Sequence, residues 1–193
     1  EFCAWAEDAH GLPLAETFVP RFDTDDFLAR LDRWLEAHEN IDLVVPRCHV
    51  MGVTLAENYR RGHHPQDWDI TRDIIAADYP EDLAIFDEVA GDNHIRLGNM
   101  FLMRRALLDA YCTWLFDILF KLEAADADRS RYSVQQARYL GYVAERLFTV
   151  WIEKTRRAQP QLRIHDAGIL NLSNALILPW ASGEAFNSPV DIN

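Results

Sequence analysis

Two long helical patterns in the second half of the chain constrain its fold most strongly. Apolar side chains recur at helical spacing between residues 105 and 124, at Leu107, Leu108, Tyr111, Cys112, Leu115, Phe116, Leu119 and Leu122. Because successive helical residues turn by about 100°, this spacing puts them on one face of a helix. A second pattern begins at Ser133, a residue type that caps helices, and runs to about Arg157 before Pro160 ends it. Two amphipathic helices of this length predict a helix-rich domain.

Shorter elements accompany these two helices. An acidic cap and apolar residues at helical spacing predict a helix over residues 25–38, and Pro65 fits the first turn of another helix. The β-branched run at residues 41–46 predicts a short strand. Further extended segments are expected at residues 94–97, 99–103 and 162–164. Short strands between dominant helices predict an α/β, helix-rich fold class.

The domain organisation is simple. A chain of 193 residues is long enough for one domain with a sizeable core. Residues 1–22 contain a glycine and two prolines without a clear hydrophobic period, so we predict an irregular lead-in there. We predict one domain over residues 23–180 and a loose tail over residues 181–193.

The net charge and the cysteine content limit which partners the protein can bind and which cellular compartment it suits. The 31 acidic and 19 basic residues give a formal net charge of −12, and such a surface repels phosphate backbones, so we expect no nucleic-acid partner. Three cysteines without paired spacing suit a reducing cytoplasm. No stretch reaches the roughly 18 apolar residues that a membrane-spanning helix needs. The sequence starts at Glu1 without a signal-peptide pattern, so we expect a cytoplasmic protein whose chain begins further upstream.

Glu145 is the carboxylate that the helical pattern singles out. Residues three, four and seven positions apart share a helix face, which puts Glu145 at the edge of the buried face. Gly141 precedes it by one turn, where glycine costs about 1 kcal/mol relative to alanine and leaves space above the carboxylate. A carboxylate at such an edge is paired, hydrogen-bonded or facing a ligand. The pattern leaves two interpretations open, an acid that does chemistry and a structural partner of a neighbouring arginine.

An acid pair and two histidines form a second candidate group. Asp67-Trp68-Asp69 has the spacing with which nucleotide-sugar transferases hold a divalent ion, Mg²⁺ or Mn²⁺, through hard oxygen ligands. The same acids also suit the first turn of a predicted helix, where negative charge is favourable. His63 and His64 precede the pair, and they could either hydrogen-bond a sugar hydroxyl or phosphate, or lie in a surface turn.

A series of short motifs follows one another between Asp42 and Ile164. The motifs occupy residues 41–46, 59, 63–64, 67–70, 74–75, 79–80, 99–103, 111–116 and 136–151. In this order and spacing the chain resembles a family of bacterial capsule and O-antigen biosynthesis proteins. That family has long been labelled a domain of unknown function, and it includes galactofuranosyltransferase modules.

This resemblance implies a GT-A-like glycosyltransferase fold with a nucleotide-binding half and an acceptor-facing half. It implies a UDP-sugar donor and a lipid-linked or oligosaccharide acceptor, with peripheral association at the cytoplasmic face of the inner membrane through other parts of the protein. Members of the family start with a longer amino-terminal section, which residues 1–22 are too short to hold. We therefore expect the nucleotide-binding half to be incomplete in this chain.

The resemblance also assigns roles to residues. In such folds the strand before the long helices lines the donor sugar, which indicates Asn99, and an acid near the helix start is the general base, which indicates Glu145. Transfer also needs cations to stabilise the leaving diphosphate, and Arg138 and Arg146 lie on the same helix. Further substrate-binding residues are expected in the matching motifs, at His63, His64, Asp67 and Gln136.

The leading hypothesis is a hexosyltransferase that moves a hexosyl unit, with galactofuranose as one candidate, from a UDP-sugar to a growing cell-surface polysaccharide. The alternative is a non-catalytic glycan- or partner-binding module derived from the same fold. A third interpretation is a helical interaction domain, in which Glu145 would be fully buried against an arginine.

Overall fold

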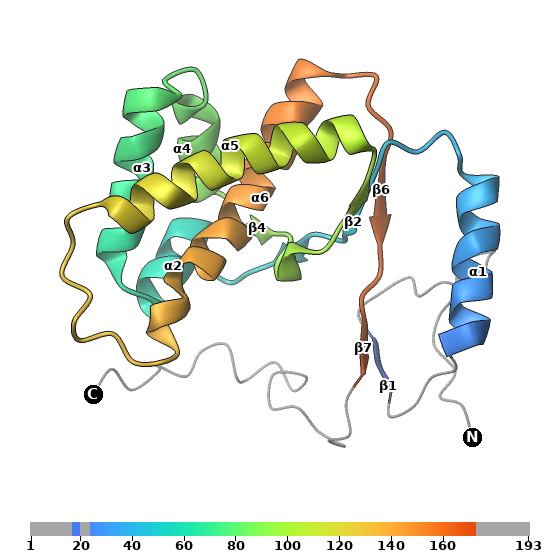
Figure 1. The fold of residues 1–193 in the computed structure, drawn as a ribbon, viewed down its shortest axis with the longest axis horizontal. Helices are drawn as coiled ribbons and strands as arrows, with labels where there is room; N and C mark the ends of the chain where they lie inside the picture. The colour runs from blue at the N-terminus through green and yellow to red at the C-terminus, as the bar shows by residue number, and fades with distance from the viewer. Residues whose placement is uncertain (1–16, 20–23, 173–193) are drawn as a thin grey trace. The chain divides into compact units, whose positions relative to one another are not determined.

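The computed structural model describes residues 17–19 and 24–172 (Figure 1). These residues form two compact units. The terminal unit combines the described residues up to Arg47 with those from Arg163 onward, and the central unit is residues 48–162. Within the described part of the chain, no helix has the length and apolar character required to cross a lipid bilayer.

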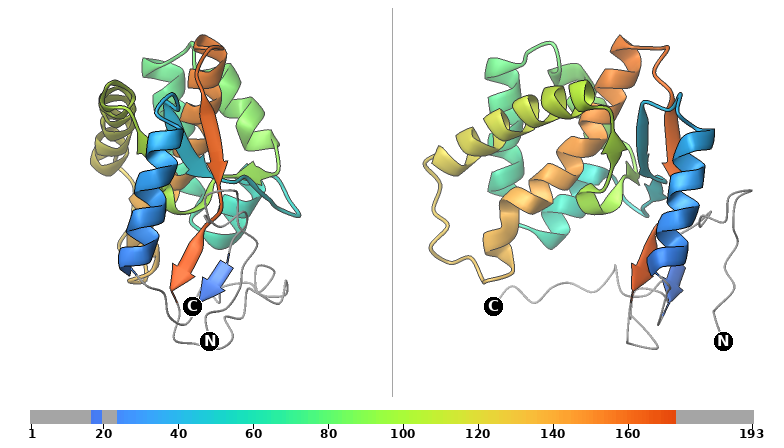
Figure 2. Two further views of the ribbon diagram at one scale, coloured as in Figure 1. Left: turned by 90° about the vertical axis from the view of Figure 1, so that its right-hand side faces the viewer. Right: turned by 45° about the vertical axis from the view of Figure 1, so that its right-hand side comes forward.

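The terminal unit combines helix α1 with parallel strands (Figure 2). Helix α1 spans Thr24–Ala37, β2 (Leu43–Pro46) pairs with β6 (Ile164–Ala167), and β1 (Thr17–Val19) pairs with β7 (Leu170–Leu172). The partners in each pair are far apart in the sequence, so the whole central unit is the connection from β2 to β6. Parallel strands require such a crossover, because a tight turn reverses the chain direction and can join only antiparallel strands.

Helices make up most of the central unit, where α6 packs against α3, α4 and α5 (Figure 1). The helix bounds are Leu55–Gly62 for α2, Pro65–Asp78 for α3, Leu83–Gly91 for α4, Arg105–Ala124 for α5 and Tyr139–Ala158 for α6. Short strands and 3₁₀ turns join them, namely β3 (His49–Val50), β4 (His94–Ile95), η1 (Leu97–Asn99), β5 (Leu102–Met103) and η2 (Gln136–Arg138). β3 and β4 pair antiparallel, which closes the chain around α2 to α4.

Aromatic side chains fill the core of the central unit. Trp68 of α3 contacts Tyr59 of α2 at 5.3 Å and Phe86 of α4 at 4.9 Å between ring centroids. Tyr111 of α5 lies 5.3 Å from Phe148 of α6. All five rings are buried, and full burial of a large apolar side chain stabilises a fold by roughly 1.5–3 kcal/mol. These ring contacts hold α3 against α2 and α4, and α5 against α6.

Locally encoded elements agree with the sequence-based predictions. The helices predicted over residues 25–38 and 105–124 are confirmed as α1 and α5, and Pro65 is the first residue of α3. The predicted strand at residues 41–46 is confirmed as β2, shortened to Leu43–Pro46. The helix-rich α/β fold class is confirmed.

Two predictions around the long helices were wrong. Residues 99–103 do not form one strand, because Asn99 takes a left-handed conformation in η1 and only Leu102–Met103 pairs as a strand. Ser133 does not cap α6 itself. Its Oγ accepts a hydrogen bond from the Gln136 N–H at 3.2 Å, at the first residue of the 3₁₀ turn η2, and α6 begins only after this turn, at Tyr139.

The ends of the chain differ from the predictions for a non-local reason. Within the predicted irregular lead-in, residues 1–22, Thr17–Val19 form β1, and its partner β7 lies at Leu170–Leu172. A three-residue strand has no period to detect, so only its distant partner reveals it. The strand predicted at residues 162–164 is β6, which starts at Ile164 and is not the last strand of the chain, because β7 follows it. The predicted tail, residues 181–193, lies outside the described residues, and the domain limits of 23–180 stay a prediction.

Candidate functional site

Glu145 lies near the start of α6 and is oriented by two donors. Its Oε1 accepts a hydrogen bond from the backbone N–H of Gly98 at 2.6 Å, and its Oε2 lies 3.2 Å from Nη1 of Arg146. The Glu145 side chain keeps 21% of its surface exposed. The carboxylate is therefore held in one orientation without being enclosed.

The turn η1 supplies the N–H donor to Glu145. Gly98 and Asn99 have φ values of 89° and 48°, in the left-handed region. The φ of 89° is what favours glycine at position 98, because the atom that a Cβ there would approach at 2.8 Å is only the end of the flexible Met100 side chain. Asn99 Nδ2 reaches the carbonyl of Gly141 at 3.5 Å, where an added Cβ would meet nothing within 4 Å. The surface of α6 one turn before Glu145 is open, as the glycine predicted.

Arg146 is a buried cation that positions its neighbours. Its side chain is 6% exposed, and its guanidinium lies 5.2 Å from the centroid of the Tyr59 ring. Nη2 donates to Oδ1 of Asn58 at 2.7 Å, and Nη1 donates to the carbonyl of Tyr142 at 3.0 Å as well as to Glu145. Burial lowers the pKa of Arg146, and the Glu145 charge opposes that shift. Among the described residues Nε of Arg146 has no hydrogen-bond partner.

His63 caps the end of α2 and packs against the start of α6. Its ring stacks on Tyr142 with centroids 4.0 Å apart, and its Nδ1 lies 3.3 Å from Oε1 of Gln136. Gln136 in turn donates from Nε2 to the carbonyl of Gly62 at 2.9 Å. Burial, together with the charge of Arg146, lowers the pKa of His63 from 6.5 to about 4, although the Gln136 hydrogen bond acts in the opposite direction. His63 is therefore neutral at pH 7.

The neutral state of His63 predicts a pH dependence of stability. The pKa is about 4 in the folded protein and 6.5 ordinarily, so the unfolded chain binds more protons between these values. The His63 contribution to stability is complete above pH 6.5 and is lost as the pH falls towards 4. Urea unfolding midpoints measured at pH 5 and pH 7 should therefore differ less in a His63→Phe variant than in the wild type. An unchanged difference would contradict a partly buried, neutral His63.

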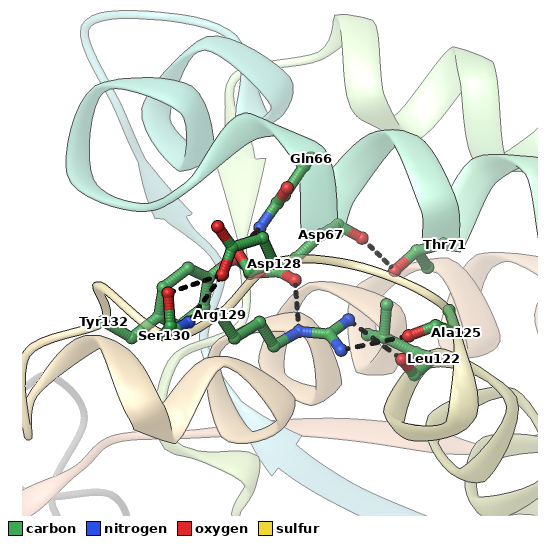
Figure 3. Close-up of polar contacts among 9 residues, drawn as sticks. All are labelled: Gln66, Asp67, Thr71, Leu122, Ala125, Asp128, Arg129, Ser130 and Tyr132. Carbon is green, nitrogen blue, oxygen red and sulfur yellow. Dashed lines mark hydrogen bonds and ion pairs between the residues drawn. The ribbon is translucent and has the colours of Figure 1, made fainter.

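Asp67 belongs to a separate, buried network (Figure 3). Arg129, from the loop after α5, donates from Nε to Asp67 Oδ1 at 3.1 Å, and the Tyr132 hydroxyl donates to Oδ2 at 2.7 Å. Gln66 donates to the same hydroxyl at 2.7 Å, and Arg129 also reaches the carbonyl of Leu122 at 2.9 Å. Asp67 is 0% exposed, so its oxygens serve this network and tie the loop to the start of α3.

The residues of the acid pair do not fit a shared metal ion. Asp67 is enclosed by Arg129 and Tyr132, whereas Asp69 is exposed and forms an ion pair with Arg60. Throughout the stretches that the structure describes, no group of three or more His, Cys, Asp or Glu side chains could hold a metal. The contacts of Asp67 therefore suit a structural role better than a divalent-ion ligand.

The predicted site residues fall into two groups. The start of α6 gathers Glu145, Arg146, Gln136, His63 and Asn99. The exposed Arg138 belongs to the same end of α6, and its guanidinium lies 5.9 Å from the Tyr142 ring centroid. Asp67 and His64 lie with the loop after α5, where the His64 ring stacks on Tyr132 at 4.0 Å.

The sequence missed several residues that shape the site. Asn58 carries no motif, and nothing in the chain pattern links α2 to Arg146. Arg129 and Tyr132 lie between α5 and η2, in a stretch whose sequence did not indicate a contact with Asp67. Gly98 could have been found, because Gly-Asn is a turn dipeptide that tolerates left-handed conformations.

Three comparisons relate the chain to known proteins. Residues 23–157 match the family described as a domain of unknown function, DUF4422. A comparison with curated proteins finds no match. A solved structure, the apo form of the bifunctional glycosyltransferase WbbM, aligns with a TM-score of 0.73 and 27% sequence identity. The alignment covers 88% of this chain but only 30% of WbbM, so this chain corresponds to about a third of that protein.

These comparisons confirm the predicted fold, a helix-rich, GT-A-like glycosyltransferase fold. The family match spans well over half of the sequence and includes the whole of both groups of candidate residues. The chain therefore belongs to the DUF4422 family.

Proposed function

We propose that this chain is the transferase part of a glycosyltransferase that moves a hexosyl unit from a UDP-sugar to a growing cell-surface polysaccharide. The likeness to WbbM, a bifunctional glycosyltransferase, over 88% of the chain carries the proposal. The hexosyl group, with galactofuranose as the first sugar to test, follows from the resemblance of the motif series. In this proposal the protein works at the cytoplasmic face of the inner membrane, where a lipid-linked acceptor is presented.

Glu145 is the general base of the proposed transfer. In a single displacement, the acceptor hydroxyl oxygen forms a bond to the anomeric carbon while the bond from that carbon to the diphosphate oxygen breaks. The hydroxyl proton passes to the Glu145 carboxylate, and UDP leaves. The Gly98 N–H and Arg146 hold the carboxylate at fixed contacts of 2.6 and 3.2 Å, so it is oriented before the acceptor arrives.

The two arginines divide the cationic roles. Arg138 is exposed at the end of α6 where Glu145 lies, so its guanidinium is free to approach a leaving diphosphate. Arg146 is buried and already bonded to Glu145, Asn58 and the Tyr142 carbonyl. It therefore supports the site as a positioning residue.

One observation favours the second candidate, a glycan- or partner-binding module. Oε2 of Glu145 pairs with Arg146, and a structural ion pair needs no substrate. Full burial of Glu145 against Arg146 would have favoured a binding module or a helical interaction domain. The side chain instead keeps 21% of its surface exposed, and it lies beside the open surface at Gly141. Both features suit a carboxylate that meets a substrate.

Calorimetric titration and a transfer assay of the full-length protein separate the two candidates. A transferase is expected to bind UDP and UDP-galactofuranose and to release UDP when an oligosaccharide acceptor is added. A binding module is expected to bind the oligosaccharide, to give no heat with UDP and to release none. That second pattern would overturn the transferase proposal.

A further inference from the structure

The amide of Gln136 has only one workable orientation. The carbonyl oxygen of Gly62 can only accept a hydrogen bond, and it lies 2.9 Å from the Gln136 amide. The nitrogen of that amide must therefore face Gly62, which turns Oε1 of Gln136 towards His63. The opposite orientation would place two acceptors against each other.

This orientation decides where His63 carries its proton. Oε1 of Gln136 can only accept, and it lies 3.3 Å from Nδ1 of His63. Nδ1 must therefore be the protonated nitrogen. In a neutral imidazole the other nitrogen, Nε2, then has a free lone pair and acts only as an acceptor.

Nε2 of His63 has no hydrogen-bond partner in the part of the chain that the structure describes. The described residues form no hydrogen bond with it, and it is not one of the enclosed polar atoms that lack a partner. The ring is fixed by stacking on Tyr142 at 4.0 Å and by Tyr59 at 4.9 Å. His63 therefore presents a rigid acceptor to solvent at the end of α2.

The charges around His63 keep this acceptor neutral. Arg146 of α6 and the adjacent His64 both disfavour a second proton on the ring, and burial acts in the same direction. The Gln136 amide carries no charge, and burial raises the pKa of Tyr59 so that its ring stays neutral. A neutral acceptor cannot bind phosphate oxygens, which also only accept.

We propose that Nε2 of His63 accepts a hydrogen bond from a hydroxyl of the sugar ligand, and that Gln136 is the positioning residue that fixes the required tautomer. The inference rests on the proposed function for the identity of the ligand as a sugar. The geometry of Gly62, Gln136 and His63 stands independently of it. The assignment excludes the diphosphate of the donor as the partner of His63.

The first test is nitrogen-15 NMR of the histidine rings in the wild-type protein. We expect His63 in the Nδ1–H form at pH 7. A Gln136→Leu variant should lose that preference, whereas the matched control Gln135→Leu, which changes an exposed neighbouring glutamine, should keep it. An Nε2–H form of His63 in the wild type would overturn the inference without any use of a ligand.

The second test compares calorimetric titrations with UDP, UDP-galactose and methyl β-galactoside. Gln136→Leu should weaken binding of a sugar-containing probe by roughly 2- to 12-fold, the range for one net hydrogen bond, and leave UDP unchanged. A loss with UDP-galactose alone assigns the hydroxyl to the donor, and a loss with the methyl galactoside assigns it to the acceptor.

The outcomes separate the inference from the proposed function. An equal loss with UDP and UDP-galactose would show a phosphate contact and overturn the inference. Wild-type binding that Gln136→Leu leaves intact for all three probes would overturn the hydroxyl role alone. If the wild type binds none of them, the proposed function fails and the hydroxyl role fails with it, whatever the NMR tautomer.

Discussion

A Glu145→Gln variant is expected to lose transfer activity by about 100- to 10,000-fold, the usual contribution of a general base. Glutamine keeps the length of the side chain and an oxygen for the Gly98 N–H, which Glu145 now accepts at 2.6 Å. The turn η1 should therefore remain in place. An amide cannot take the proton of the acceptor hydroxyl, so the loss should fall on kcat and leave UDP binding intact. Steady-state assays of the full-length protein measure this.

Glu153 provides a matched control on the same helix. Its side chain is also 21% exposed, and it pairs with Arg156 and Arg157. Glu153→Gln therefore removes an equally exposed, arginine-paired carboxylate of α6 and should leave turnover near the wild-type level. Transfer that persists in Glu145→Gln, or that falls equally in both variants, would remove Glu145 from the role of base.

The sequence predicts those parts of the fold that neighbouring residues determine. Helix α5 follows from its apolar spacing, and the start of α3 follows from Pro65. The position of Glu145 at the edge of a buried face also follows from helical geometry. In contrast, β1 forms only because Leu170–Leu172 lies beside it, and three residues carry no detectable pattern. Pairings over such separations are set by tertiary packing.

The same distinction applies to the candidate site. Helical spacing could indicate Glu145, but the Gly98 donor is 47 residues away and reaches it only through a left-handed turn. The Gln136 contact that fixes His63 joins residues 73 positions apart. Asp67-Trp68-Asp69 has the local spacing of a metal-binding acid pair, but the Asp67 oxygens bind Arg129 and Tyr132 instead. These two residues belong to a loop more than 60 positions away, so the motif alone could not reveal the contact.

The Asp67 network predicts a large effect on stability from a single change. Asp67→Ala should lower the free energy of unfolding by about 3 kcal/mol, because it leaves a largely buried cation without its counter-charge. The Arg129 side chain is only 16% exposed, and the Tyr132 hydroxyl would lose its acceptor as well. Urea unfolding followed by tryptophan fluorescence measures the change, since Trp68 is buried next to Asp67 on α3.

Asp69→Ala is the control that separates this network from a metal-binding pair. Asp69 lies two residues further along α3, its side chain is 54% exposed, and its partner Arg60 is 48% exposed. Exposed ion pairs contribute less than about 1 kcal/mol, so the unfolding curve of Asp69→Ala should stay close to that of the wild type.

A metal-binding pair behaves differently, because Mn²⁺ would stabilise the wild type and either substitution would abolish that gain. An equal loss of stability in Asp67→Ala and Asp69→Ala, together with stabilisation of the wild type by Mn²⁺, would contradict the structural role of Asp67. A large effect at Asp67 alone, with no response to Mn²⁺, would leave the Arg129 and Tyr132 contacts as the reason for its burial.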